Sequence, residues 1–120
     1  RLAVSEINAK GGVLGRPLEL VERDDEAKNE RGVQVAQELI HKEKVAAGLG
    51  IINTGVALAS ARFYQEAKVP LITPGPSGTT LPEQFGPPKS PASYIFRVSL
   101  RDAIQVEMIV AEVLRQVASP

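Results

Sequence analysis

The stretch that decides the fold is VAAGLGIINTG, residues 45–55, in which an apolar, glycine-punctuated run ends in small polar residues. A second run of the same kind, VPLITPGPSGTT, occupies residues 69–80. We predict buried strands at 45–50 and 69–72, each followed at its carboxyl end by a polar turn. Because the carboxyl ends of parallel strands share one edge of a sheet, both turns are expected to open there. Hydroxyls and free backbone N–H groups at such an edge suit a carboxylate or another small anion.

Helical and strand-like patterns alternate around these two runs. Helices are expected at residues 1–10, 29–42, 54–68 and 102–117, and further strands at 18–22 and 94–98. Residues 74–91 are rich in proline and are predicted to be a loop. In the last helix, the residues expected to face inward are Val106, Ile109, Val110, Val113 and Val117. The alternation predicts an α/β fold: a parallel sheet with helices on both faces.

Composition excludes several classes of function. The 120 residues suffice for one domain, and 14 basic residues balance 14 acidic ones, so no basic surface favours nucleic acid. Cysteine is absent and histidine occurs once, so we expect no transition-metal site. We see no nucleophile elbow and no histidine placed to activate Ser60 or Ser77, and therefore expect neither catalysis nor a cofactor.

Two motifs invite an enzymatic interpretation that the rest of the sequence does not support. Gly48 and Gly50 resemble part of a dinucleotide fingerprint, but Asn53 stands at the third glycine position and no acidic residue closes the next strand. Asp24 and Asp25 resemble part of a phosphoacceptor site, which needs a further aspartate after the central strand. We expect these aspartates to lie in a solvated turn where one of them caps the next helix.

Thr54 and Ser77 have two interpretations. Either hydroxyl is able to cap a helix N-terminus, as such residues commonly do. Two hydroxyl-bearing turns on adjacent strands, each with glycine, favour a ligand site instead. Asp102, at the start of the last predicted helix, either caps that helix or adds a negative charge at the same edge to meet an ammonium group.

Three segments together resemble the N-terminal lobe of a type I periplasmic binding protein, in the leucine/isoleucine/valine-binding branch of ABC-importer receptors. They are AVSEINAKGGVLGRPLELVERDDEAKN, then GLGIINTGVALASARFYQEAKVPLITPGPSGTTL, then YIFRVSLRDAIQ. The resemblance implies two α/β lobes that close over a small ligand about a hinge. Residues 1–120 are then expected to form part of the N-terminal lobe, without its first strand and without the second lobe.

The resemblance also implies roles for the two turns and for Asp102. Thr54 matches a hydroxyl residue that binds the ligand carboxylate, Gly75 a backbone contact, Ser77 a second hydroxyl and Asp102 an acid that holds the ligand ammonium. Branched-chain binders commonly carry a serine cluster where Asn53, Thr54 and Gly55 stand, and two alanines where Gly75 and Pro76 stand. The complete set of expected ligand-binding residues is Asn53, Thr54, Gly55, Gly75, Pro76, Ser77 and Asp102.

The implied function is that of the substrate-binding component of an ABC importer, located in the periplasm or anchored by lipid outside the cell. Its partners are then an amino acid or similar small carboxylate and the permease subunits in the membrane. Relatives with such loops are expected to include binders of aromatic carboxylates and amides. A sensory domain of the same fold and a doubly wound enzyme are the alternatives, and the enzyme needs acid–base groups from outside this chain.

Overall fold

The computed structural model describes residues 1–118. In chain order the elements are α1 (Leu2–Ala9), α2 (Asn29–Gln37), the π-helical segment η1 (Glu38–Lys42), β1 (Gly48–Leu49), α3 (Thr54–Ala67), β2 (Leu71–Thr73), α4 (Thr80–Glu83), β3 (Ile95–Arg97) and α5 (Asp102–Val117). The predicted helix at 29–42 is therefore present, but its last turn is wound more widely than an α-helix.

The strands form a parallel sheet in the order β1-β2-β3. Leu71 lies beside Gly48 on one side and Ile95 on the other, and Thr73 pairs with Arg97. All three carboxyl ends consequently meet at one edge of the sheet, which confirms the predicted parallel α/β arrangement.

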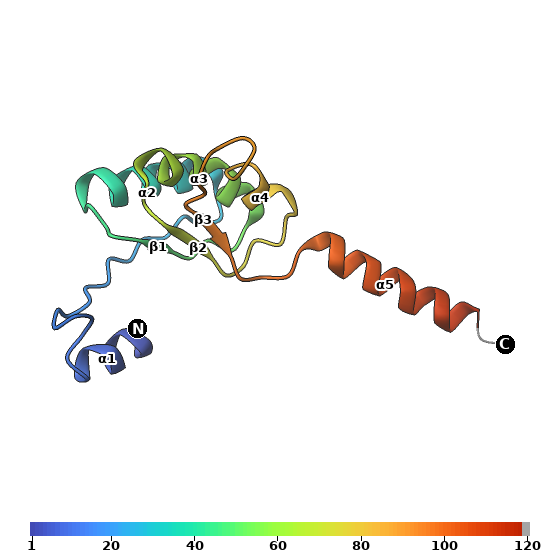
Figure 1. Cartoon of the computed structure of the whole chain (residues 1–120), viewed down its shortest axis with the longest axis horizontal. Helices are drawn as coiled ribbons and strands as arrows, with labels where there is room; N and C mark the ends of the chain where they lie inside the picture. The colour runs from blue at the N-terminus through green and yellow to red at the C-terminus, as the bar shows by residue number, and fades with distance from the viewer. Residues whose placement is uncertain (119–120) are drawn as a thin grey trace.

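Helices α2 and α3 cover one face of this sheet (Figure 1). The two helices approach closely at Gly32, where an added Cβ would overlap the side chain of Val56 and lie 3.0 Å from Ser60 Oγ. The buried apolar residues between these helices and the sheet are Ala36, Ile40, Ala57, Ala61, Tyr64, Leu71, Leu81 and Ile95. This core is what fixes the edge on which the two polar turns lie.

The opposite face of the sheet is not covered by helices of the described chain. Helices α1 and α5 lie away from the sheet (Figure 1), and neither contains a buried residue. The residues of α5 that were predicted to face inward are exposed, as are Leu49 and Phe96 on the sheet. An amphipathic pattern shows that a helix has an apolar face, but not which partner covers it.

The strand predicted at residues 18–22 is not formed. Its backbone at Leu18 is held instead by the Asn8 side chain, whose Nδ2 donates to the Leu18 carbonyl at 2.8 Å and whose Oδ1 accepts from the Leu18 N–H at 2.7 Å. A strand requires a neighbouring strand to complete its ladder, and no strand pairs with this segment within residues 1–118.

Helix α4 lies within the segment that was predicted to be a loop. It forms because Leu81 is fully buried in the core, which offsets the ordering of a short helix. Pro82 is tolerated because the N–H groups of a first helical turn have no partner within the helix. The second polar turn ends where this helix begins, at Thr80.

Leu71→Ala should lower the free energy of unfolding by about 2–5 kcal/mol, since it leaves a cavity at the centre of the core. Leu71 is 1% exposed, whereas Leu14 is 97% exposed. Leu14→Ala, the same chemical change without burial, is the control and should leave stability nearly unchanged. Urea denaturation followed by circular dichroism measures both, and equal effects would contradict this description of the core.

Candidate functional site

The two polar turns lie in direct contact. Thr54 Oγ1, at the start of α3, accepts a hydrogen bond from the Gly78 N–H at 3.3 Å. An added Cβ on Gly78 would overlap the Thr54 side chain, and one on Gly75 would lie 2.8 Å from Ile52 Cα. These two glycines therefore permit an approach that residues with side chains would prevent. The predicted juxtaposition of the turns is present in the structure.

The Thr54 hydroxyl is not a helix cap. Asn53 holds the N-cap position of α3, and no side chain caps the helix there. A hydroxyl has one hydrogen to donate and two lone pairs to accept with. Because the Gly78 N–H occupies a lone pair, the Thr54 O–H remains free to donate to a ligand oxygen. Gly55, the next residue, packs on the other side, where an added Cβ would lie 3.1 Å from Asn29 Oδ1.

Ser77 and Asp102 are joined through the backbone. The Asp102 N–H donates to the Ser77 carbonyl at 2.9 Å, so the start of α5 is tied to the second turn. The N-cap residue of α5, Arg101, makes no side-chain cap hydrogen bond, and Asp102 is exposed. Thr79 Oγ1 accepts from the Ala103 N–H at 3.4 Å. The Asp102 carboxylate is thus not used as a cap, and its role toward an ammonium group stays a prediction.

Pro76 is buried beneath the second turn. Its carbonyl accepts a hydrogen bond from Ser99 Oγ at 2.5 Å. Ser77, the next residue, is half-buried. The structure therefore places the seven predicted residues along one edge, with different degrees of access.

Sequence reasoning missed two residues, at the end of the third strand and just after it, that bind the second turn. Arg97 ends β3, and its Nη1 donates to the carbonyls of Gly78 at 2.7 Å and Ser77 at 3.4 Å. Ser99 follows two residues later. The signal was available, since the rule that was applied to the ends of the first two strands also places the end of the third at this edge.

The backbone is strained where the first turn begins. Ile51 has φ +66°, in the left-handed region that β-branched residues rarely adopt. Its carbonyl lies 3.2 Å from the position of an added Cβ on Gly75. Strained residues persist where surrounding contacts over-determine them, and they cluster at functional sites. The strain at Ile51 is consistent with a turn that is held in place by its neighbour.

A hollow of about 390 Å³ lies beside the first turn, lined by Arg23, Asp24, Asp25, Ala27, Ile51, Ile52 and Asn53. Asp24 Oδ1 accepts from the Glu26 N–H and Asp25 Oδ1 from the Ala27 N–H, both at 2.8 Å. The prediction that one aspartate caps the next helix is therefore wrong. Each aspartate closes a tight turn two residues on, which competes with capping.

Arg23, which lines this hollow, forms ion pairs with the first residue of η1 and with the residue that follows η1. Its Nη2 lies 2.8 Å from carboxylate oxygens of both Glu38 and Glu43. The hydrogen bond from Arg23 holds the pKa of Glu38 below its usual range. These carboxylates consequently neutralise the Arg23 charge, so Arg23 offers no unpaired positive charge to a ligand in the hollow.

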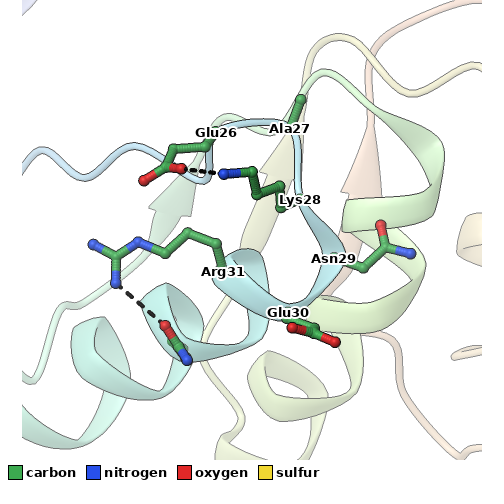
Figure 2. A pocket seen from close by; sticks show the side chains of 7 residues that line it. Glu26, Ala27, Lys28, Asn29, Glu30 and Arg31 are labelled. Atoms are coloured by element: carbon green, nitrogen blue, oxygen red, sulfur yellow. Dashed lines mark hydrogen bonds and ion pairs between the residues drawn. The ribbon is translucent and has the colours of Figure 1, made fainter.

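A larger surface hollow of about 620 Å³ lies at the start of α2 (Figure 2), where the Glu26 carboxylate pairs with Lys28 Nζ at 2.7 Å. Arg31 also donates to Gln34 Oε1 at 3.4 Å. Among the charged residues that line this hollow, Glu26 and Lys28 thus pair with each other. None of the seven predicted ligand-binding residues lines it.

Within residues 1–118, no group of three histidine or acidic side chains is arranged to hold a metal ion. No helix in the same range combines the length and the hydropathy that crossing a bilayer requires.

A family model, a curated relative and solved structures all match this chain to binding proteins. A family model described as "Periplasmic binding protein" matches residues 1–118. The Leu/Ile/Val-binding protein homolog 2 of Brucella abortus is 37% identical over 82 residues, which is 68% of this chain and 22% of that protein. The chain thus spans about a fifth of the length of this curated relative.

Two solved structures resemble the chain closely. An ABC transporter substrate-binding protein from Desulfitobacterium hafniense in complex with Leu has a TM-score of 0.82 and 30% identity, covering 96% of this chain and 32% of its own. A solute-binding protein of an ABC transporter from R. palustris, in complex with 4-hydroxybenzoate, has a TM-score of 0.73 and 33% identity. The match covers 94% of this chain and 29% of that protein's chain. Both support the parallel-sheet lobe described above.

Gly78→Ala should destabilise the protein by about 1–3 kcal/mol, because the new methyl group forces the two turns apart. Adding Thr54→Ser removes the methyl group that it meets and should restore most of that loss. Gly86→Ala is the control, since the nearest atoms to its added Cβ are 3.9 Å away. Thermal unfolding measures all three variants, and a Gly78→Ala protein as stable as Gly86→Ala would show that the turns are not in contact.

Proposed function

The chain belongs to the periplasmic binding protein family, and from this premise we propose that residues 1–120 form part of the N-terminal lobe of an ABC-importer substrate-binding protein. The whole protein then captures a small ligand outside the cytoplasm and delivers it to permease subunits in the membrane. The match over residues 1–118 and the two-lobed relatives support this assignment.

We propose that the ligand carries a carboxylate and that Thr54, Ser77 and the backbone of residues 75–78 bind it. The observation that carries this proposal is the hydrogen bond from the Gly78 N–H to Thr54 Oγ1, which leaves the Thr54 O–H available to donate. The ligands named for the two related structures, Leu and 4-hydroxybenzoate, share only a carboxylate as a charged group. The preferred ligand class is an amino acid, with an aromatic carboxylate as the alternative.

Asp102 distinguishes these ligand classes. Its exposed carboxylate at the same edge suits the ammonium group of an amino acid, which a hydroxybenzoate lacks. Asn53, Gly55, Gly75 and Pro76 complete the lobe's side of the site through backbone and packing.

The ligand is proposed to be held between this edge and a second lobe, so that binding shifts the protein toward a closed form. Such a shift requires that the ligand bind the closed form more tightly than the open one. Binding without turnover fits the relatives, which are named as binding proteins.

Thr54→Ala and Ser77→Ala should each weaken binding of the preferred carboxylate ligand roughly tenfold or more, the value of a hydrogen bond to a charged group. Isothermal titration calorimetry on the full-length protein measures the effect, after a thermal-shift screen against amino acids and hydroxybenzoates identifies the ligand. Thr54→Ser, which keeps the hydroxyl, is the matched control. Unchanged affinity in both alanine variants would remove these residues from the site.

A further inference from the structure

Arg97 is half-buried at the end of β3, where its side chain reaches across to the second polar turn. Its Nη1 donates to the Gly78 carbonyl at 2.7 Å and to the Ser77 carbonyl at 3.4 Å. Among the described residues, no carboxylate lies within ion-pair distance of this guanidinium, whereas the neighbouring Arg101 pairs with Glu83 at 3.6 Å. Arg97 Nη1 is therefore committed to backbone carbonyls of the second turn.

A planar trans peptide group turns its C=O and the following N–H in opposite directions. Fixing the Ser77 carbonyl therefore also fixes the direction of the Gly78 N–H. That carbonyl accepts from two groups, Arg97 Nη1 and the Asp102 N–H at 2.9 Å. The Gly78 carbonyl, bound by Arg97 and by the Leu81 N–H at 3.3 Å, fixes the next peptide group in the same way.

The Gly78 N–H in turn donates to Thr54 Oγ1. While that bond is present, the threonine oxygen acts as an acceptor toward the protein, and its hydrogen points away from Gly78. If the peptide group rotated by half a turn, the Ser77 carbonyl would replace the Gly78 N–H beside Thr54. The hydroxyl would then donate to that carbonyl and present its lone pairs to the ligand, where they would repel a carboxylate. The direction of the Thr54 O–H thus depends on a chain of contacts that begins at Arg97.

We propose that Arg97 is a positioning residue of the carboxylate site, which sets Thr54 as a hydrogen-bond donor by holding the Ser77–Gly78 peptide group. This inference rests on the function proposed above. Arginine suits the task because its planar fork carries several donors in fixed directions and stays charged at every physiological pH. Lysine supplies donors without the fork, and methionine supplies neither.

A double-mutant cycle on ligand affinity tests this role in the full-length protein, with L-leucine and 4-hydroxybenzoate as the probes in calorimetry. Arg97→Met and Thr54→Val should each weaken binding by about tenfold, the effect of one lost hydrogen bond to a charged group. Because both changes act on the same bond, the double variant should bind about as weakly as Thr54→Val alone. Arg97→Lys should recover part of the affinity.

Arg101→Met is the matched control, since it removes a positive charge from the same edge without touching the turn's carbonyls. It should leave affinity nearly unchanged. A multiplicative loss in the double variant, or wild-type affinity in Arg97→Met, would overturn the proposal. If Arg97→Met does not fold, Arg97→Gln replaces it in the same cycle.

Hydrogen exchange of the Gly78 amide gives a readout that needs no ligand. Exchange should be faster in the Arg97 variants than in wild type, and unchanged in Arg101→Met. If no amino acid or hydroxybenzoate in the thermal-shift screen binds the wild-type protein, the proposed function fails. Unchanged exchange at Gly78 in the Arg97 variants would separately overturn the role of Arg97.

Discussion

The hydrogen bond from the Gly78 N–H to Thr54 Oγ1 joins two turns that are 24 positions apart in the chain. It forms only because β1 and β2 run parallel, so that their carboxyl ends reach the same edge of the sheet. It also requires that the turns approach without side chains between them, which Gly75 and Gly78 allow. The two turns that meet at this contact carry six of the seven proposed ligand-binding residues, and the seventh, Asp102, is tied to the second turn through its backbone N–H.

Residues at the end of the third strand and beyond it bind the second of these turns. Arg97 and Ser99 donate to carbonyls of the turn, and the backbone N–H of Asp102 donates to another from the start of α5. Such a network uses the carbonyls of the turn toward the protein and leaves the Thr54 hydroxyl hydrogen unclaimed. A prearranged donor binds an anion more strongly than a mobile one, because less ordering is needed when the ligand arrives.

The pattern of the sequence was sufficient to predict the parallel sheet and the edge at which the polar turns lie. Apolar runs ended by small polar residues placed Thr54 and Ser77 correctly at one edge, because strand direction alone determines where carboxyl ends lie. The same reasoning did not reach Arg97, since an arginine after a strand has many common roles on a surface. It also missed α4, whose formation depends on Leu81 finding a place in the core.

Two predictions were wrong because local patterns do not specify partners. The segment at 18–22 alternates as a strand does, yet it meets the Asn8 side chain rather than a neighbouring strand. The last helix has an apolar stripe, yet it lies away from the sheet (Figure 1). By itself the sequence determined the order of elements, the direction of the strands and the residue types at their ends, because these depend on periodicity and turn chemistry. Only the tertiary structure decided that Thr54 Oγ1 accepts from the Gly78 N–H, so that its own O–H remains a donor. It also decided that Arg97 binds the second turn. Both roles depend on contacts between residues far apart in the chain.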